Sequence, residues 1–200
     1  MITVVDYGMG NLRNVRRAVE ELGYPALVSA SPQNLSAATG IVLPGVGAFG
    51  EAVRRIDALG FRSPLLEAVR RGVPLLGICL GMQLLFERSE ESPGAHGLGL
   101  LSGDVVRFSG ALKVPHIGWN DVVPLLPSPL FPEGTSLTFY FVHSFYVAGS
   151  LAAIARTSYG VEFDSAVGRD AVFGVQFHPE KSQADGLSLL GNFLQLTAIR

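Results

Sequence analysis

The chain has 200 residues, of which 48% are hydrophobic and 16% are charged, and its formal net charge is −2 at pH 7. This length and composition are typical of one globular domain with a substantial core, and they exclude a disordered chain. The small net charge gives no electrostatic reason to expect a nucleic acid or an anionic membrane as a partner. We therefore expect residues 1–200 to form a single domain.

The cysteine content and the first residues bear on the cellular compartment. The sequence holds one cysteine, so no disulfide can form within the chain, and nothing indicates an oxidising compartment. The start, MITVVDYG, lacks a basic segment, and Asp6 interrupts its apolar run, so we expect no secretory signal. No apolar stretch approaches the roughly 20 residues needed to span a bilayer. The expected location is the cytoplasm.

The first part of the chain alternates short apolar runs with segments of helical periodicity. Strands are expected at residues 2–6, 26–29 and 40–44. Helices are expected at about residues 12–22, 52–59 and 63–71. This alternation is typical of a parallel sheet that is covered by helices on both faces.

The rest of the chain is organised around residues 73–87, VPLLGICLGMQLLFE. An apolar run ends at Cys79 and residues at helical spacing follow, so the sequence predicts a strand, a sharp turn and a helix. The thiol would lie at the end of the sheet, near the positive start of a helix that favours thiolate. Gly77 and Gly81 flank it because a Cβ at either position would collide with neighbouring backbone. Taken alone, G-x-C-x-G fits a buried structural cysteine equally well.

The second half of the chain contains short β-rich segments with little helix. Strands are expected at residues 105–108, 120–123, 136–142, 152–157, 162–167 and 172–176. Successive short strands joined by turns favour antiparallel additions to the parallel core. A last helix is expected after Ser182, its N-cap. We therefore predict an α/β fold: an open, mostly parallel central sheet flanked by helices, with antiparallel strands added in the C-terminal half.

A candidate base follows the last predicted strand, in His178-Pro179-Glu180. Proline keeps the preceding residue extended, and residues two apart on an extended chain point to the same side, so Glu180 can lie beside the imidazole of His178. A carboxylate there would hold one ring nitrogen as a donor and leave the other to accept a thiol proton. Such pairs also occur on protein surfaces without a chemical role. The assignment therefore requires that Cys79 and His178 meet in the fold.

Several sequence blocks resemble a known family. GICLGMQLLFE around Cys79 and HPEKS around His178 resemble the class I, or triad, glutamine amidotransferases. DYGMGNLRNV, LPGVGAFG, PHIGWN and YFVHSFY resemble one branch of that family, which releases ammonia for a cyclase in histidine biosynthesis. The resemblance covers essentially the whole chain, and it implies the class I glutaminase fold and hydrolysis of L-glutamine to glutamate and ammonia by a Cys79, His178 and Glu180 triad. Phe145 departs from the pattern, which has tyrosine there.

The resemblance also implies roles for residues outside the triad. Two backbone N–H groups would form the oxyanion hole, those of Val46 and Leu80. Four residues would bind glutamine: Gly47, Gln83, His143 and Ser144. From the residues alone, Gln83 also fits an exposed polar position on a helix, and His143 also fits a satisfied strand histidine. His96 stays unassigned, and His116 is expected in packing or at an interface.

A partner subunit is expected, whereas a metal or a cofactor is not. The chain has no H-x-x-x-H or C-x-x-C pair. Free ammonia is protonated and lost in water, so the resemblance implies a second subunit, a cyclase built as a (β/α)8 barrel. Candidate residues for the docking face are Asn11, Trp119, Tyr140 and Lys181. Trp119, in an expected Gly-Trp-Asn turn, fits either an interface anchor or a core tryptophan.

Three other functions stay open on the sequence. A class I glutaminase that serves pyridoxal phosphate or purine synthesis would share the triad but lack DYGMGNLRNV and PHIGWN. A cysteine hydrolase or a redox-sensing protein of similar fold would act without a partner. A catalytically silent binding subunit would make no use of Cys79 as a nucleophile.

Overall fold

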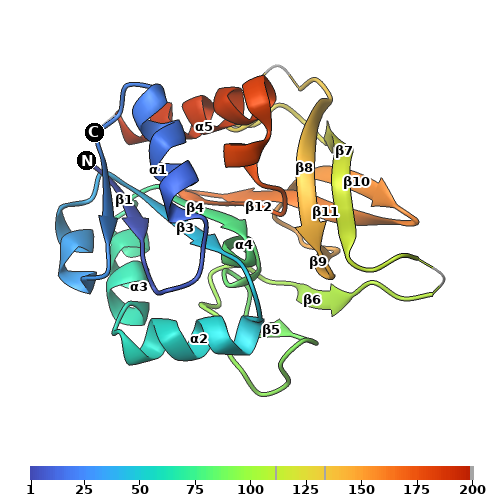
Figure 1. The fold of residues 1–200 in the computed structure, drawn as a ribbon, viewed down its shortest axis with the longest axis horizontal. Coiled ribbons are helices and arrows are strands. Elements are labelled where there is room, and N and C mark those ends of the chain that lie inside the picture. The colour runs from blue at the N-terminus through green and yellow to red at the C-terminus, as the bar shows by residue number, and fades with distance from the viewer. Residues whose placement is uncertain (111, 133, 199–200) are drawn as a thin grey trace.

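The computed structural model describes residues 1–110, 112–132 and 134–198 of the chain (Figure 1). In the first half, strands and helices alternate in the order β1 (Ile2–Val5), α1 (Leu12–Glu21), β2 (Ala26–Ser29), η1 (Pro32–Ala37), β3 (Gly40–Gly45), α2 (Phe49–Ala58), α3 (Arg62–Arg70) and β4 (Leu75–Cys79). Every strand and helix predicted for this half is present. The 3-10 helix η1 is an addition that periodicity does not predict.

The second half is built mainly from strands. Its elements are α4 (Leu80–Gln83), β5 (Arg88–Ser89), β6 (Asp104–Arg107), β7 (His116–Pro124), β8 (Leu137–His143), β9 (Phe145–Ala148), β10 (Ala153–Tyr159), β11 (Val161–Arg169), β12 (Val172–Val175), η2 (Pro179–Lys181) and α5 (Gln183–Thr197). Every predicted strand of this half is present, and β5 and β9 are additional. β7 begins earlier than predicted, so Trp119 lies inside a strand and not in a turn.

One sheet runs through the molecule in the strand order β2-β1-β3-β4-β12-β11-β10-β7-β8. Neighbouring strands from β2 to β12 are parallel, whereas those from β12 to β8 are antiparallel. β5, β6 and β9 form a side branch that joins the sheet through β11. The predicted fold class, a parallel sheet with antiparallel strands added in the C-terminal half, is therefore confirmed.

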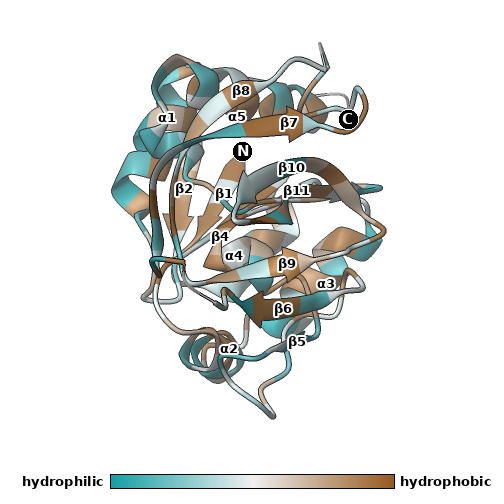
Figure 2. Ribbon diagram, turned by 90° about the vertical axis from the view of Figure 1, so that its right-hand side faces the viewer, coloured by the Kyte–Doolittle hydropathy of each residue, from teal (hydrophilic) through white to brown (hydrophobic). Residues whose placement is uncertain are grey.

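Helices cover both faces of the parallel strands (Figure 1), and a hydrophobic layer lies beneath the helices on each face. On one face, α1 and α5 contribute side chains such as Val19 and Phe193 to the layer that contains Val4. On the other face, α2 and α3 contribute to the layer that contains Val5. Val4 and Val5 enter opposite layers because side chains alternate across a strand. The outer surface of α1 is hydrophilic (Figure 2). In the described part of the chain, no helix combines the length and the apolar character needed to cross a membrane.

The sheet brings distant parts of the sequence together at one edge. β4 and β12 are parallel neighbours, with Val175 opposite Ile78. β3 lies on the other side of β4, with Gly45 opposite Cys79. The carboxyl ends of three strands therefore meet around Cys79, and open α/β sheets place their sites at this edge.

The helix that follows Cys79 is shorter than predicted. It ends at Gln83, although its apolar periodicity continues to Phe86. The Phe86 N–H donates to the carbonyl of Gln83, only three residues back. The Leu98 N–H donates to the carbonyl of Leu84. The loop after Phe86 therefore occupies acceptors that a longer helix would need. The periodic residues remain buried, so periodicity predicted their burial correctly but not the end of the helix.

Candidate active site

Cys79 lies at a sharp turn between β4 and α4. Its backbone has φ 55° and ψ −111°, a left-handed conformation that is rare for a residue with a side chain. A Cβ on Gly77 would lie 2.5 Å from the carbonyl oxygen of Gly81, and a Cβ on Gly81 would lie 1.8 Å from that of Leu43. Both contacts are with backbone, which cannot move aside cheaply. The glycines are therefore required by close approach, as the sequence predicts.

His178 and Glu180 form a buried pair just beyond β12. His178 Nδ1 lies 2.9 Å from Glu180 Oε1, and each side chain is at most 2% exposed. The route to this contact differs from the predicted strand alternation: His178 is extended, but Pro179 begins the 3-10 turn η2, which folds Glu180 back toward the ring. Because the carboxylate can only accept, Nδ1 carries the proton.

Ser182 and Tyr140 fix the backbone around His178. Ser182 occupies the predicted N-cap position of α5, but its hydroxyl makes no capping hydrogen bond. The hydroxyl donates to the carbonyl of His178 at 2.6 Å and accepts the Tyr140 N–H at 3.0 Å. The His178 N–H in turn donates to the carbonyl of Tyr140 at 2.9 Å. The backbone that carries the imidazole is thus tied to β8 as well as continuing from β12.

Charge interactions hold His178 in its protonated form. Burial alone would lower its pKa, but the interactions with Cys79 and Glu180 outweigh burial and raise the pKa from 6.5 to about 10. Nε2 is buried, and among the described residues no polar atom other than the Cys79 sulfur competes for it; Cys79 raises the pKa of His178 first through hydrogen bonding and then through its charge. Burial and the Cys79 charge also raise the pKa of the Tyr7 hydroxyl, which stays neutral. The arrangement therefore suits a thiolate–imidazolium pair.

A cavity of about 350 Å³ opens beside Cys79. Its lining includes all of the residues predicted for the oxyanion hole and for substrate binding: Val46, Gly47, Leu80, Gln83, His143 and Ser144. A Cβ on Gly45 would lie 2.9 Å from the Leu80 Cβ, so the end of β3 packs tightly against the elbow, and Gly47 in the turn that follows has φ +94°. The cavity is large enough for an amino acid and borders the sulfur.

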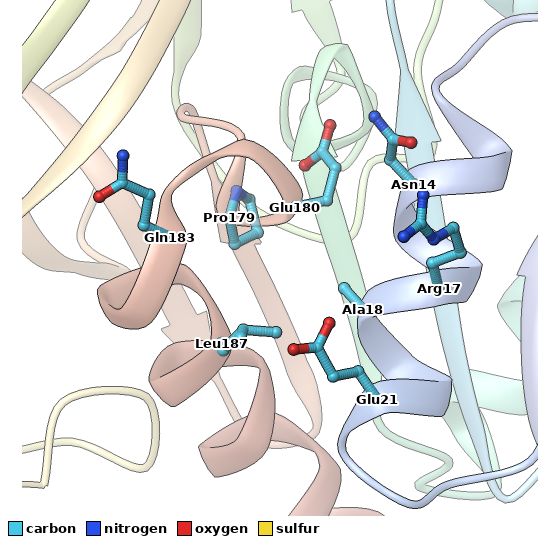
Figure 3. A pocket seen from close by; sticks show the side chains of 8 residues that line it. All are labelled: Asn14, Arg17, Ala18, Glu21, Pro179, Glu180, Gln183 and Leu187. Carbon is cyan, nitrogen blue, oxygen red and sulfur yellow. The ribbon is translucent and has the colours of Figure 1, made fainter.

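A second cavity, of about 320 Å³, lies between α1 and the start of α5 (Figure 3). Glu180 and Pro179 of η2 line it, and Asn14 and Arg17 extend toward it from α1. Cys79 is not among its lining residues. Glu180 therefore contacts the imidazole through Oε1 and also borders a space outside the Cys79 cavity.

Two buried side-chain amides form a hydrogen-bonded pair beside the sulfur, and sequence reasoning treated both of them incompletely. Gln83 Nε2 donates to the Phe145 carbonyl at 3.1 Å and to Gln176 Oε1 at 3.0 Å. Gln176 Nε2 lies 3.7 Å from Cys79 Sγ, within reach of a hydrogen bond to sulfur. Sequence reasoning missed Gln176, although it lies two residues before His178 and strand alternation points it to the same side.

Glu91 is a second residue that sequence reasoning missed. It borders the Cys79 cavity, and its carboxylate accepts the Phe49 N–H at 2.6 Å, at the start of α2. No periodicity places it there, because it lies in the loop after β5. Only the closing of that loop onto α2 brings this negative charge to the cavity.

The remaining histidines have different surroundings. His143 Nδ1 lies 2.8 Å from the Phe145 carbonyl, and His143 Nε2 lies 3.0 Å from His116 Nδ1. His116 is buried among aromatic rings, with the Tyr159 ring centroid at 4.1 Å. His96 is exposed and lies 3.9 Å from Glu87. The structure therefore places His116 in packing, as expected, and also in a hydrogen-bonded chain with His143.

Three of the four candidate docking residues lie together. Trp119 is 49% exposed and stands opposite Tyr140 in the β7–β8 ladder, with the ring centroids 6.1 Å apart. The Lys181 ammonium lies 5.7 Å from the centroid of the Tyr140 ring. Asn11 precedes α1, and within the described residues no hydrogen bond or ring contact joins it to the others. The tryptophan is therefore a surface residue and not a core one.

Comparison with known proteins gives the family. The profile described as glutamine amidotransferase class-I matches residues 3–196. The chain is 52% identical over 197 residues to "Imidazole glycerol phosphate synthase subunit HisH" of Desulfitobacterium hafniense (strain Y51), covering 96% of this chain and 93% of that protein. It is 47% identical over 197 residues to the subunit of the same name from Methanothermobacter thermautotrophicus, covering 98% of each.

Solved structures share the fold. One described as a glutamine amidotransferase superposes with a TM-score of 0.80 at 20% identity and covers 100% of both chains. A chain of PurLQS from Thermotoga maritima superposes with a TM-score of 0.77 at 22% identity and covers 97% of each. At these identities the likeness concerns the fold alone, but the family match spans nearly every residue. The chain belongs to the class I glutamine amidotransferases.

Proposed function

We propose that this chain is the glutaminase subunit of imidazole glycerol phosphate synthase. In this proposal it hydrolyses L-glutamine to L-glutamate and ammonia through a cysteinyl thioester. It delivers the ammonia to a cyclase subunit, a (β/α)8 barrel, which makes imidazole glycerol phosphate and aminoimidazole carboxamide ribotide in histidine biosynthesis. The names of relatives that are about half identical over nearly their whole length support this proposal. A single domain and a cytoplasmic location are part of it.

One observation carries the mechanism: the ends of β4 and β12 bring Cys79 to the charged pair of His178 and Glu180. The thiolate of Cys79 attacks the side-chain amide carbon of glutamine, and the oxyanion accepts hydrogen bonds from the backbone N–H groups of Val46 and Leu80. His178 gives its proton to the departing ammonia. Its neutral ring then takes a proton from the water that cleaves the thioester, and Glu180 holds the Nδ1 tautomer throughout.

The polar groups of the cavity suit the two ends of a free amino acid. Glu91 offers a carboxylate to the α-ammonium group of glutamine. Gln83 uses both amide hydrogens internally, so its Oε1 is the atom that remains to accept a hydrogen bond. Gly47, His143 and Ser144 border the same space. In the proposed complex these groups hold glutamine with its side-chain amide at the sulfur.

Replacing the nucleophile tests the proposed function. We expect the wild-type chain to copurify with the cyclase and to release glutamate and ammonia in equal amounts. Cys79→Ala should lower this release by at least about a thousandfold, because the base alone cannot replace the covalent step. The measurement is glutamate formation by the complex with and without the ligand of the cyclase. Glutamate release that survives Cys79→Ala would refute the mechanism, and equal turnover without any cyclase would favour an independent cysteine hydrolase.

A further inference from the structure

A chain of hydrogen bonds with fixed direction runs from β7 to the Cys79 cavity. The carbonyl of Phe145 can only accept, so His143 Nδ1 carries the hydrogen in that contact. Burial lowers the pKa of His143 to about 3 and that of His116 to about 4, so both rings are neutral. His143 Nε2 is therefore an acceptor and takes the hydrogen of His116 Nδ1. His116 Nε2 in turn accepts from Asn120 Nδ2, 3.2 Å away.

Each end of this chain is anchored. The second hydrogen of Asn120 Nδ2 goes to the Ser158 carbonyl at 3.0 Å, and Asn120 Oδ1 accepts the Asp121 N–H at 2.8 Å, so the amide cannot flip without losing both. At the other end, the Phe145 carbonyl is a pure acceptor. A carbonyl cannot pass a proton onward, so this series of hydrogen bonds cannot conduct protons to the cavity. What it does fix is the position of each group and the direction of each hydrogen bond.

The same carbonyl fixes the amides beside the sulfur. Phe145 O also accepts from Gln83 Nε2, and the other hydrogen of Gln83 Nε2 goes to Gln176 Oε1. Because Oε1 of Gln176 is turned toward Gln83, Nε2 of Gln176 is turned toward Cys79 Sγ. A flipped Gln176 amide would set two N–H groups against each other. The direction of the hydrogen bond from Gln176 to the sulfur therefore follows from the Phe145 carbonyl, which can only accept.

We propose that Gln176 is a catalytic residue whose amide N–H stabilises the Cys79 thiolate, and that Asn120, His116 and His143 are positioning residues that hold this amide through the Phe145 carbonyl. This inference rests on the proposed glutaminase function. Gln176 is 0% exposed, so its hydrogen bond is shielded from competing water. A hydrogen-bond donor at sulfur favours the anion over the neutral thiol and thus the nucleophilic form.

Other charged and titratable groups also face Cys79. His178 lies at the end of β12 with Glu180 behind it, Tyr7 follows β1, and Glu91 borders the cavity from the loop after β5. These groups are unchanged when only Gln176 is replaced. A difference in thiol ionisation between the wild type and a Gln176 variant therefore reports on the amide.

Alkylation of the thiol tests the role of Gln176. The chain has one cysteine, so the rate of iodoacetamide labelling against pH, followed by mass spectrometry of the full-length chain, reports on Cys79 alone. Gln176→Met keeps the length of the side chain but removes the donor, and it should raise the labelling midpoint by about one pH unit. Gln176→Glu should raise it further, because the carboxylate adds a negative charge. Gln195→Glu, on the exposed side of α5, is the matched control and should leave the midpoint unchanged.

A matched pair of variants tests the positioning residues. Asn and Leu have nearly the same shape, but only Asn keeps a donor at the position of His116 Nδ1. His116→Leu should raise the Cys79 labelling midpoint, whereas His116→Asn should leave it closer to that of the wild type, although both leave the same space unfilled.

The outcomes separate this inference from the proposed function. An unchanged midpoint in a folded Gln176→Met variant, with its melting temperature recorded, would overturn the catalytic role of Gln176 even if the wild-type complex hydrolyses glutamine. Equal midpoints for His116→Leu and His116→Asn would overturn the positioning role. A wild-type complex without glutaminase activity would instead refute the proposed function, whatever the labelling shows.

Discussion

His178 keeps a charge that its burial opposes. A buried imidazole ordinarily becomes neutral, as His116 and His143 do, but Glu180 and Cys79 reverse this for His178. The difference lies in the partners: a carboxylate and a thiol surround one ring, whereas carbonyl, amide and imidazole groups surround the others. The presence of Glu180 and Cys79 beside the ring therefore decides that His178, and neither His116 nor His143, can act as a proton donor.

The raised pKa of His178 predicts a pH dependence of stability. A group whose folded pKa is raised stabilises the fold fully below its unfolded pKa and loses this effect as the pH rises through the folded value. The free energy of unfolding should therefore fall between pH 6.5 and about 10. Glu180→Gln should reduce this fall, because it removes one charge that raises the pKa. Urea unfolding across this range measures it.

Glu162→Gln is the control for this measurement. Glu162 is exposed on β11 and lies 3.7 Å from Arg156, and surface pairs of this kind contribute little to stability. The free energy of unfolding of the Glu162→Gln variant should therefore depend on pH as that of the wild type does. If Glu180→Gln shows the wild-type slope as well, the carboxylate does not hold the charge of His178.

Sequence reasoning at the residue scale found the groups that stand in recognisable local patterns. Cys79 between two glycines and His178 before Pro179 are visible in the sequence. Glu91 is not, because its place at the cavity depends on a contact with α2 that no local pattern encodes. Strand alternation puts Gln176 on the same side as His178, but only the contact with Cys79 gives that position a meaning. An interior amide is distinguished from an ordinary strand residue only by the atoms around it.

At the scale of elements, the elbow depends on contact between β3 and α4. The Cβ that Gly81 lacks would strike the carbonyl oxygen of Leu43, in the middle of a buried strand. The sequence predicted β3 because it is an apolar run bounded by glycines. It predicted the turn after β4 because Cys79 ends an apolar run and has a glycine two residues before it and another two residues after it. It misplaced the end of α4, because the acceptors that end this helix are taken by a loop further along the chain.

Gly81→Ala should destabilise the fold by about 1–3 kcal/mol or more, because the added methyl group forces two backbones apart. Gly191→Ala is the matched control. Gly191 lies in α5, its Cβ would meet only the Leu22 side chain at 3.8 Å, and alanine there should stabilise the helix by roughly 0.5–1 kcal/mol. Thermal and urea unfolding of both variants give the comparison. A Gly81→Ala variant as stable as the wild type would show that the elbow can relax.

At the scale of the whole molecule, exposed apolar side chains gather on the outer face of β7. Ile117 is 58% exposed, Trp119 49% and Val123 53%, and these residues alternate along the strand. Tyr140 and Lys181 extend the patch toward η2, which carries Glu180. A partner that covers this face would therefore contact residues next to Glu180 and its imidazole partner, His178.

Trp119→Ala should weaken binding of the cyclase by about tenfold or more, because a large exposed aromatic side chain is a typical interface anchor. The stability of the free chain should change little, since half of the side chain is in water. Leu59→Ala, at the end of α2 and 44% exposed, is the control on another part of the surface. Titration calorimetry with the purified cyclase measures both affinities. Equal affinities would place the docking face elsewhere.

The fold class was predictable because alternating helices and strands allow few arrangements. The adjacency of β4 and β12 was not, because pairing between strands so far apart in the chain leaves no trace in local periodicity. The resemblance of the sequence blocks around Cys79 and His178 to one family is what connects the two strands at the level of sequence. Long-range pairing is thus the part of this molecule that local physical chemistry leaves undetermined.

That pairing has a consequence for biosynthesis. A ribosome makes β4 early, but the strand that completes the centre of the sheet emerges only after the whole antiparallel half. A nascent or truncated polypeptide that ends before β12 would carry Cys79 without His178, and so the proposed nucleophile without its proposed proton donor. Stalled translation products and N-terminal proteolytic fragments should therefore be unable to waste glutamine, and catalytic competence arrives together with the completed sheet.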